Sequence, residues 1–352
     1  MLTNKTILIT GGTGSLGKVL VRRLLSGEMG QPKKIIIFSR DEAKQHFMRV
    51  EYLNRKVATD EVIYSNFCRM LEFRIGDVRD FHSIAGALKG VDVVFNAAAL
   101  KQVPSCEYFP YEAVQTNVTG PENIVRAIRE EELPIETVVG ISTDKACKPV
   151  NVMGMTKALQ ERIFIKANLD CPKTRFICVR YGNVLASRGS VIPLFHEQIK
   201  KGGPVTITTP EMTRFLLSLD QAVDTIFEAV RTAKRGETYI PRVPSAKVMD
   251  IAKALIGERD IRIEITGIRP GEKIHEILVS EEEAHRTIER GNYYVILSML
   301  PELVRDSPPS NAIKKEYGSG DNLMTLNEVY ETLHKYHLLL EDLHEYEGEL
   351  LR

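Results

Sequence analysis

The chain has 352 residues, which is enough for two or three domains of roughly 100 to 200 residues each. Its 47 Lys and Arg residues balance 47 Asp and Glu residues, so there is no net charge to attract nucleic acid or an anionic membrane surface. The composition, 43% hydrophobic and 27% charged, is that of a soluble globular protein, and no run reaches the roughly 20 apolar residues of a membrane span. We therefore expect no nucleic-acid partner and no membrane partner.

The N-terminus and the cysteines indicate the cellular compartment. The first residues lack the apolar segment and the small-residue cleavage site of a signal peptide, so we expect a cytoplasmic protein. The five cysteines are odd in number and widely spread, without a C-x-x-C spacing that would indicate a metal site. We expect reduced thiols and no bound metal. Cys147 lies in a polar stretch, but no catalytic partner for it is evident, which favours a buried or incidental thiol.

Six apolar, β-branched runs alternate with amphipathic or helix-favouring stretches in the first half of the chain. The runs cover residues 6–10, 34–38, 71–75, 91–96, 137–141 and 176–180. This alternation predicts an α/β fold with a Rossmann-type, doubly wound parallel sheet that has helices on both faces. Because ligands of such sheets bind beyond the carboxyl ends of the strands, the functional residues are expected to follow the strands.

The rhythm of the sequence changes after residue 182, where Gly and Pro become frequent and strand and helix no longer alternate strictly. We predict a dinucleotide-binding domain over 1–182, to which 216–238 returns, and a smaller interleaved α/β substrate-binding lobe over 183–215 and 239–300. Residues 301–352 form a C-terminal helical tail in which Leu326, Val329 and Leu333 fall at helical spacing. The polar face of this helix is acidic, so it is expected to pack on the body or on another subunit.

A glycine-rich loop follows the first predicted strand and precedes a helical stretch. Glycine is required at Gly11 for a tight turn, at Gly14 for the approach of a pyrophosphate, and at Gly17 for close packing of helix against strand. The start of the helix then offers N–H groups to the phosphates. The sequence therefore predicts a dinucleotide site that also includes the loop residues Thr13, Ser15 and Leu16.

The second predicted strand ends at Ser39-Arg40, without the acidic residue that binds the ribose 2′-hydroxyl of NAD. Arg40 is suited to a 2′-phosphate, which favours NADP over NAD, although it is also compatible with a solvated loop residue. Asp77-Val78 follow the third strand, where the Asp77 carboxylate can accept from an adenine amino group or cap the next helix.

The fifth strand runs into Thr143-Asp144-Lys145, and a helix begins near Asn151. Met153 and Lys157 lie four residues apart on one face of this helix. In isolation, Asp144-Lys145 is compatible with a surface ion pair, but its place after a sheet strand favours a reactive centre.

Here the chain resembles the extended short-chain dehydrogenase/reductase superfamily. Its Thr-Gly-x-x-Gly-x-x-Gly loop corresponds to Gly11, Gly14 and Gly17, and its Asn-Ala-Ala segment to Asn96-Ala97-Ala98, which the resemblance places at the cofactor. The catalytic helix of that superfamily normally carries Tyr-x-x-x-Lys, whereas this chain has Met153 ahead of Lys157. A thioether cannot exchange protons, so another group must take the proton of the oxidised alcohol, or the protein is not an oxidoreductase.

The resemblance narrows to the UDP-N-acetylglucosamine 4,6-dehydratase family of polysaccharide biosynthesis proteins, over residue 5 to about residue 280. Several members of that family, including the C5-inverting branch, similarly carry Met in place of the tyrosine. The segments that carry the resemblance cover residues 99–104, 143–145, 180–184, 188–191, 212–215 and 269–273.

The resemblance implies a reaction that removes water from UDP-N-acetylglucosamine and gives a UDP-2-acetamido-2,6-dideoxy-4-keto-hexose, with inversion at C5. Hydride passes from C4 of the sugar to NADP+ and returns to C6 after water is eliminated across C5 and C6. Lys145, with a pKa lowered by burial or by Lys157, is expected to take the C5 proton, and Asp144 to protonate the departing C6 hydroxyl. Lys157 is assigned to the nicotinamide ribose and Thr143 to O4. The O4 proton is assigned to Lys157 or Lys145 through a water.

Binding a nucleoside diphosphate requires fixed cations, and the planar fork of arginine suits phosphate better than lysine does. Each candidate is also compatible with an ordinary salt bridge or helix cap. The candidate substrate-binding residues are Lys101, Asn183, Ser190, Val191, Arg214, Arg269 and Glu272.

Two other functions remain open from the sequence. A UDP-sugar 4-epimerase shares the oxidation at C4 but leaves Asp144 and Lys145 without a task. A non-catalytic, NADP-binding regulatory or scaffolding protein is compatible with Met153. The family resemblance and the C-terminal helix suggest a homo-oligomer, such as a hexamer, but a monomer with a docked tail fits the same pattern.

Overall fold

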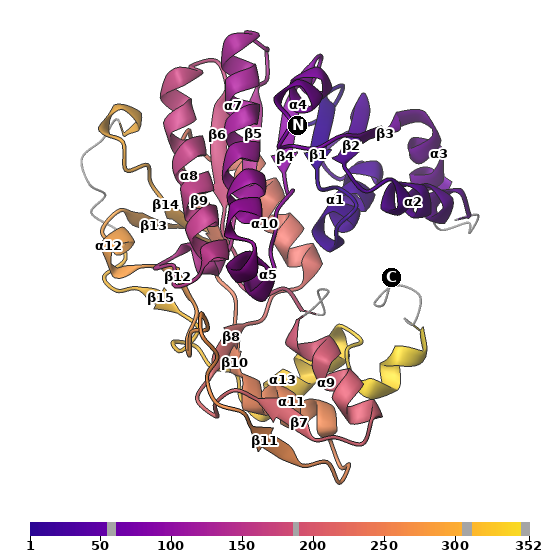
Figure 1. Ribbon diagram of the computed structural model, residues 1–352, viewed down its shortest axis with the longest axis vertical. Helices are drawn as coiled ribbons and strands as arrows, with labels where there is room; N and C mark the ends of the chain where they lie inside the picture. Colours follow the sequence, from indigo (N-terminus) through magenta and orange to yellow (C-terminus); the bar gives the residue numbers. More distant parts are fainter. Residues whose placement is uncertain (55–60, 186–189, 305–311, 346–352) are drawn as a thin grey trace.

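The computed structural model describes residues 1–54, 61–185, 190–304 and 312–345. The chain forms two lobes, a larger one built on a sheet and a smaller one that contains α9, α11 and α13 (Figure 1). Among the described helices, none is long and apolar enough to cross a membrane.

The core of the large lobe is a mixed, mostly parallel sheet. Its nine described strands have the order β13-β14-β9-β6-β5-β4-β1-β2-β3. The six predicted runs are the parallel strands β1 to β6, with ends shifted by at most two residues, so the predicted Rossmann-type fold is confirmed. The strands are β1 (Thr6–Thr10), β2 (Lys34–Ser39), β3 (Leu71–Ile75), β4 (Val93–Asn96), β5 (Thr137–Ile141), β6 (Arg175–Val179), β9 (Thr238–Pro241), β13 (Thr287–Arg290) and β14 (Tyr293–Ile296).

Helices cover both faces of this sheet, because its strands are apolar on both sides. One face is covered by α1 (Ser15–Leu25), α2 (Glu42–Asn54), α3 (Glu61–Met70) and α10 (Leu219–Thr232). The other face is covered by α4 (Phe81–Leu88), α7 (Gly120–Glu130) and α8 (Val152–Asp170). Between β4 and α7 the chain forms α5 (Val103–Tyr108), α6 (Pro110–Val114) and the π-helical turn η2 (Gln115–Thr119). Helix α10, within residues 216–238, packs on the sheet face that α1 also covers.

The sheet is wider than the sequence indicates. Residues 239–300 were expected in the substrate-binding lobe, but β9, β14 and β13 extend the main sheet beyond β6. β9 runs parallel to β6, whereas β14 and β13 add antiparallel pairs. These strands are short and lie at an edge, where the partner of a strand is not encoded in its own sequence pattern.

The small lobe has its own core, formed by apolar side chains from helices and short strands. The tail does not form a separate unit, because Val329 and Leu333 of its helix are fully buried in this core. Of the two expectations for this helix, packing on the body is the one that the structure shows. The elements of the small lobe are α9 (Val191–Lys200), β7 (Val205–Ile207), β8 (Thr213–Phe215), β10 (Ser245–Lys247), α11 (Val248–Ile256), β11 (Ile263–Ile265), α13 (Leu326–Lys335) and η5 (Leu340–Glu345). Four further elements lie beside the large lobe: β12 (Ile277–Val279), α12 (Glu281–Ala284), η4 (Pro301–Leu303) and β15 (Tyr317–Gly318).

A buried arginine connects the sheet to two helices. Arg180, directly after β6, donates to Glu161 of α8 at 3.0 and 2.6 Å and to Glu283 of α12 at 2.8 and 3.0 Å. It also donates to the carbonyl of Leu278 in β12 at 2.8 Å. All three charged side chains are buried. Since an unpaired buried charge costs several kcal/mol, these contacts fix β6, α8 and α12 relative to one another.

Because Glu283 is paired with Arg180, we predict that the protein loses stability in acid. Burial alone would raise the pKa of Glu283, but the Arg180 guanidinium lowers it from 4.5 to about 2. The stabilisation is therefore complete above pH 4.5, the value for the unfolded chain, and is lost as the pH falls towards 2. The difference corresponds to about 3 kcal/mol of unfolding free energy.

Urea unfolding at a series of pH values between 7 and 2.5 measures this effect. Glu283→Gln should lower the stability at pH 7 and remove this part of the acid dependence. Glu130→Gln, which alters an exposed ion pair with Arg126, should leave the dependence unchanged. An acid dependence of wild-type size in Glu283→Gln would contradict the assignment.

Candidate active site

Two glycine positions around the loop after β1 are packed too closely to carry a side chain. Gly11 has φ of +69°, and a Cβ there would lie 2.8 Å from the backbone nitrogen of Ala98. A Cβ at Gly17 would lie 2.5 Å from the Cα of Gly12, so helix α1 contacts the loop directly. Gly14 caps α1 without a side-chain hydrogen bond, which leaves the first N–H groups of the helix available to an anion. Thr13, Ser15 and Leu16 lie in this loop and the first turn of α1.

The end of β4 offers a second contact for a cofactor. The Asn96 side-chain oxygen accepts from the Thr10 hydroxyl at 2.8 Å, and that hydroxyl accepts from the Ala98 N–H at 3.2 Å. The amide nitrogen of Asn96 is buried and has no hydrogen-bond partner within the described structure. Buried amide donors are normally satisfied, so this one fits a ligand that presents an oxygen above the sheet, as a dinucleotide does. Ala97 is held here by its N–H, which donates to the Thr10 carbonyl.

The ends of β2 and β3 come together at the expected ribose pocket. Arg40 is exposed, and its guanidinium lies 3.9 Å from the Asp77 carboxylate. Asp77 is also bound by Arg79 at 2.7 Å; burial would raise the pKa of Asp77, but the arginines lower it. Ser39 receives two hydrogen bonds from Gln45, at its carbonyl and at its hydroxyl, each 3.0 Å long. An arginine and a hydroxyl at this point suit a 2′-phosphate.

Val78 lies at the same edge of the sheet, where it has a structural role. Its side chain is buried, and its carbonyl accepts from Asn123 of α7 at 2.9 Å. These contacts fix the segment that follows β3, so the backbone around Asp77 is held in place when a ligand binds.

The segment after β5 forms a short 3-10 turn, η3 (Asp144–Ala146), that packs against the start of α8. The Thr143 hydroxyl caps the turn, and the Asp144 N–H donates to the Tyr181 carbonyl at 3.0 Å. A Cβ at Gly154 of α8 would lie 2.1 Å from the Lys145 carbonyl oxygen. The absence of a side chain at Gly154 therefore allows α8 to hold the turn at the carboxyl end of the sheet.

One lysine of this turn lies between two buried carboxylates. Lys145 Nζ donates to Asp144 Oδ1 at 3.1 Å and lies 3.1 Å from Oε1 of Glu276. The Thr143 hydroxyl donates to the same Asp144 oxygen at 2.8 Å. The second oxygens of Asp144 and Glu276 are buried and have no hydrogen-bond partner among the residues described. Lys145 and these two carboxylates therefore form one cluster, in which each carboxylate has an oxygen that is free to accept a hydrogen bond.

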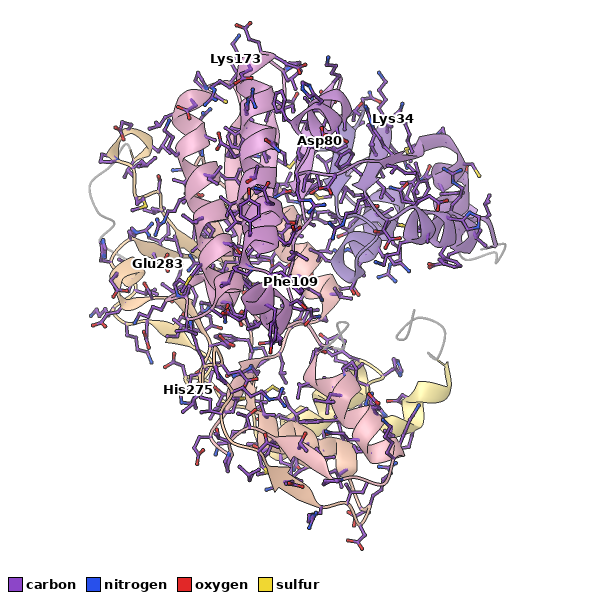
Figure 2. The ribbon with its side chains drawn as sticks, in the orientation of Figure 1. Lys34, Asp80, Phe109, Lys173, His275 and Glu283 are labelled. Carbon is purple, nitrogen blue, oxygen red and sulfur yellow. The ribbon has the colours of Figure 1, made fainter. Side chains whose placement is uncertain are left out.

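Glu276, immediately before β12, was not identified from the sequence. It lies more than 130 positions from Lys145 in the chain and is only three residues beyond the 269–273 segment that the resemblance covers. In Figure 2, the neighbouring His275 lies where the chain passes between the two lobes, and Phe109 lies at the end of the large lobe that faces the small one. The Glu276 carboxylate reaches Lys145 because β12 packs against η3.

The protonation of Lys145 differs from the sequence expectation. Burial alone would lower the pKa of Lys145, but the carboxylates of Asp144 and Glu276 outweigh it and raise the pKa above its ordinary value. The expectation of a lowered pKa is therefore wrong for this arrangement, because it counted burial but not the two carboxylates, of which Asp144 is the larger cause. Lys145 is an ammonium ion at neutral pH and can act as a base only after it loses a proton.

The pKa of Lys157, by contrast, is lowered to about 8 by burial. Its ammonium donates to the Gln160 side chain at 2.7 Å. Met153 lies in a small apolar cluster with Cys106 and Ala113, so its thioether has a packing role in this structure. Burial raises the pKa of the Cys147 thiol to about 12, which agrees with an unreactive cysteine.

The predicted phosphate-binding and sugar-binding residues fall into two groups. Arg214 of β8 joins the reactive centre: its guanidinium lies 3.8 Å from Glu276 and donates to the Thr213 carbonyl at 2.7 Å. Arg269 and Glu272 lie in the loop between β11 and β12, where the Arg269 N–H donates to the Glu272 carboxylate at 3.4 Å.

The remaining candidates follow β4 and β6. Asn183 Oδ1 and Ser190 Oγ are buried without hydrogen-bond partners in the described part of the chain, as expected of atoms that contact a ligand. Ser190 and Val191 begin α9, and Lys101 follows β4 as an exposed side chain. Arg188 and Gly189, which belong to the 188–191 segment, lie outside the described residues.

The chain shares extended similarity with proteins of known name. The sequence profile of the family described as polysaccharide biosynthesis protein matches residues 7–298. A protein of Rickettsia bellii (strain RML369-C) named UDP-glucose 4-epimerase is 43% identical over 350 residues, which cover 98% of this chain and 96% of that protein.

Solved structures extend the comparison. Pen from Bacillus thuringiensis superposes with a TM-score of 0.85 and 33% identity, over 96% of this chain and all of that chain. DesIV, a dTDP-glucose 4,6-dehydratase from Streptomyces venezuelae determined with NAD bound, has a TM-score of 0.63 and 20% identity over 76% of this chain and 86% of its own. The similarity to DesIV, at 20% identity, establishes only that the two proteins share a fold.

The packing of Gly154 leads to a prediction about stability. Gly154→Ala places a methyl group against the Lys145 carbonyl, so the turn or α8 must move, and we expect a loss of about 1 to 3 kcal/mol in unfolding free energy. Gly86→Ala in α4 is the matched control, because a Cβ there meets only the flexible end of Arg74, at 3.1 Å. Urea unfolding of both variants measures the difference. Equal stabilities would contradict the tight packing of η3 on α8.

Proposed function

The chain belongs to the polysaccharide biosynthesis protein family, within the extended short-chain dehydrogenase/reductase superfamily, and from this premise we propose that it is an NADP-dependent UDP-N-acetylglucosamine 4,6-dehydratase. The observation that carries the proposal is the buried Asp144-Lys145-Glu276 arrangement beyond β5. A reaction that only oxidises and reduces C4 has no need of an acid and a base at C5 and C6, whereas elimination of water requires both.

The bound nicotinamide cofactor supplies the acceptor for the C4 hydride and the donor that reduces C6. The proton of the C4 hydroxyl is transferred through Thr143 to Asp144. The Thr143 hydroxyl, which donates to Asp144 at 2.8 Å, accepts the hydrogen bond of O4 and passes the proton to that carboxylate. This path requires no tyrosine, in agreement with Met153. Lys157, whose pKa burial lowers to about 8, lies on the same helix as Met153 and is assigned to the nicotinamide ribose.

Lys145 and Asp144 then eliminate water. The C5–H bond breaks and its proton moves to the neutral amine of Lys145, while the electron pair forms the C5–C6 double bond. The C6–O bond breaks, and the hydroxyl leaves as water with the proton that Asp144 received from O4. The water released in this step then protonates C5 on the opposite face of the ring and takes a proton from Lys145 in return, which gives the inverted, L-configured product that we propose.

The other predicted residues are assigned to binding. Arg40 and Ser39 favour the 2′-phosphate of NADP over NAD. Arg214, Arg269 and Asn183 are assigned to the diphosphate and sugar of the substrate. The candidates Lys101, Ser190, Val191 and Glu272 complete the proposed UDP-sugar site.

A UDP-sugar 4-epimerase is the second candidate, because the 43% identical protein of Rickettsia bellii carries that name. The two activities share oxidation at C4 and differ in the product. Epimerisation leaves the C6 hydroxyl in place, whereas dehydration converts C6 into a methyl group. The Lys145 arrangement favours dehydration.

Proton NMR of the protein with NADP+ and UDP-N-acetylglucosamine in D2O tests this function. We expect a new C6 methyl signal, deuterium at C5, and ring couplings that report the configuration at C5. Asp144→Asn and Lys145→Ala should each reduce the rate about 100-fold or more, because each removes an acid or base group. Formation of UDP-N-acetylgalactosamine without a methyl signal would establish the epimerase instead. An unchanged sugar would overturn both activities for this substrate.

Cofactor choice gives a separate prediction. Arg40→Ala should weaken NADP binding about 10- to 100-fold and leave NAD binding nearly unchanged, because it removes a charge-assisted contact to the 2′-phosphate. Lys34→Ala is the matched control, since Lys34 is an exposed cation at the opposite end of the same strand. Fluorescence titration with NADPH and NADH measures the affinities. Equal losses for the two cofactors would contradict the assignment of Arg40.

A further inference from the structure

We propose that Glu276 is a positioning residue that accepts the proton of the Lys145 ammonium and thereby makes Lys145 a base; this inference rests on the proposed dehydratase function. Glu276 belongs to none of the sequence segments that indicated the reaction. Its position at the boundary of the two lobes follows from the structure alone.

The geometry fits a proton acceptor. Oε1 of Glu276 lies 3.1 Å from Lys145 Nζ, which is a distance that allows direct proton transfer. The Glu276 side chain is almost completely buried, and its backbone N–H donates to the Ser319 hydroxyl at 2.9 Å, which fixes its position. Oε2 of Glu276 has no hydrogen-bond partner in the residues that the structure describes.

The charges around Lys145 explain why an acceptor is needed. Asp144 and Glu276 favour the ammonium form, and Arg214 opposes it less strongly. Lys273, the other nearby cation, donates to the Cys147 carbonyl and has a pKa lowered by burial. Lys145 therefore begins the reaction with a proton that it must lose.

Glu276 is the carboxylate that remains available to accept the proton of the Lys145 ammonium. In the proposed mechanism Asp144 is already occupied by the O4 proton. When a UDP-sugar excludes water from the site, transfer from ammonium to carboxylate replaces two buried charges by two neutral groups, which avoids their desolvation cost.

After one complete turnover, Lys145, Asp144 and Glu276 are back in their starting protonation states. The resting site holds one proton on Lys145, and the O4 proton adds a second on Asp144. Lys145 passes its proton to Glu276, takes the C5 proton, and later gives it to the released water, which protonates the other face of C5. Asp144 loses its proton to the leaving water, and Glu276 then returns its proton to Lys145. Both carboxylates end ionised and Lys145 ends as an ammonium ion, as at the start.

Glu276→Gln tests the inference, because glutamine keeps the size and a hydrogen bond but cannot accept the proton. We expect the rate of methyl formation at pH 7 to fall about 100-fold. The remaining rate should increase with pH, up to tenfold per unit, because solvent must now deprotonate Lys145. If Glu276 only raised the pKa of Lys145, the variant would hold more neutral amine and react faster at pH 7. An unchanged or increased rate would therefore overturn the proposal.

Two further variants separate this effect from misfolding. Glu276→Asp retains a carboxylate and should recover part of the rate together with the wild-type pH profile, and a failure to exceed Glu276→Gln would overturn the proposal. Glu316→Gln, which removes an exposed carboxylate paired with Lys148, should match the wild-type rate. Urea unfolding and NADPH titration show whether each variant is folded and binds cofactor.

A direct titration of Lys145 distinguishes failure of this inference from failure of the proposed function. The ¹⁵Nζ signal of Lys145, assigned with Lys145→Arg, reports its pKa without turnover. Glu276→Gln should lower this pKa, and an unchanged value would overturn the coupling even if the wild-type protein is active. A lowered pKa in a protein that leaves UDP-N-acetylglucosamine unchanged would support the coupling and overturn only the proposed function.

Discussion

The position of the proposed reactive centre depends on one buried ion-pair cluster. Arg180 follows β6 and binds Glu161 on α8 and Glu283 on α12, all out of contact with solvent. Helix α8 holds η3 through Gly154, and α12 follows β12, next to which Glu276 lies. The cluster therefore fixes both sides of the Lys145 arrangement: the side that carries Asp144 and the side that carries Glu276. A displacement of α12 would separate Glu276 from Lys145 although neither residue touches Arg180.

The two buried charge clusters differ in how completely their polar atoms are satisfied. The Arg180 guanidinium binds both oxygens of each glutamate, so all four carboxylate oxygens have a partner. In the Lys145 cluster, one oxygen of Asp144 and one of Glu276 have none among the described residues. Fully satisfied networks specify a structure, whereas unsatisfied buried groups fit a site that is completed by a ligand. This contrast distinguishes the structural Arg180 cluster from the Lys145 cluster, for which we propose a catalytic role.

The sequence was sufficient for the parts of the fold that follow local pattern. β1 to β6, the loop around Gly11 and the start of α8 follow from apolar runs, glycines and the Asn151 cap. The partners of β9, β13 and β14 could not be read in this way, because a short strand carries no signal for the strand beside it. The predicted Asp144 and Lys145 do lie together. Their electrostatics could not be predicted in full, since the carboxylate of Glu276, from a distant segment, adds to that of Asp144 in raising the pKa of Lys145.

The interleaving of the two lobes has a consequence for the order of folding on the ribosome. β6 ends at Val179, but its neighbour β9 begins only at Thr238, after the chain has passed through α9 and α10. At roughly 5 to 20 residues per second, the nascent sheet exposes an unpaired apolar edge for several seconds. The core of the small lobe is completed later still, when Val329 and Leu333 emerge. The N-terminal half of the chain is thus most prone to aggregation before the remaining strands of the sheet are made.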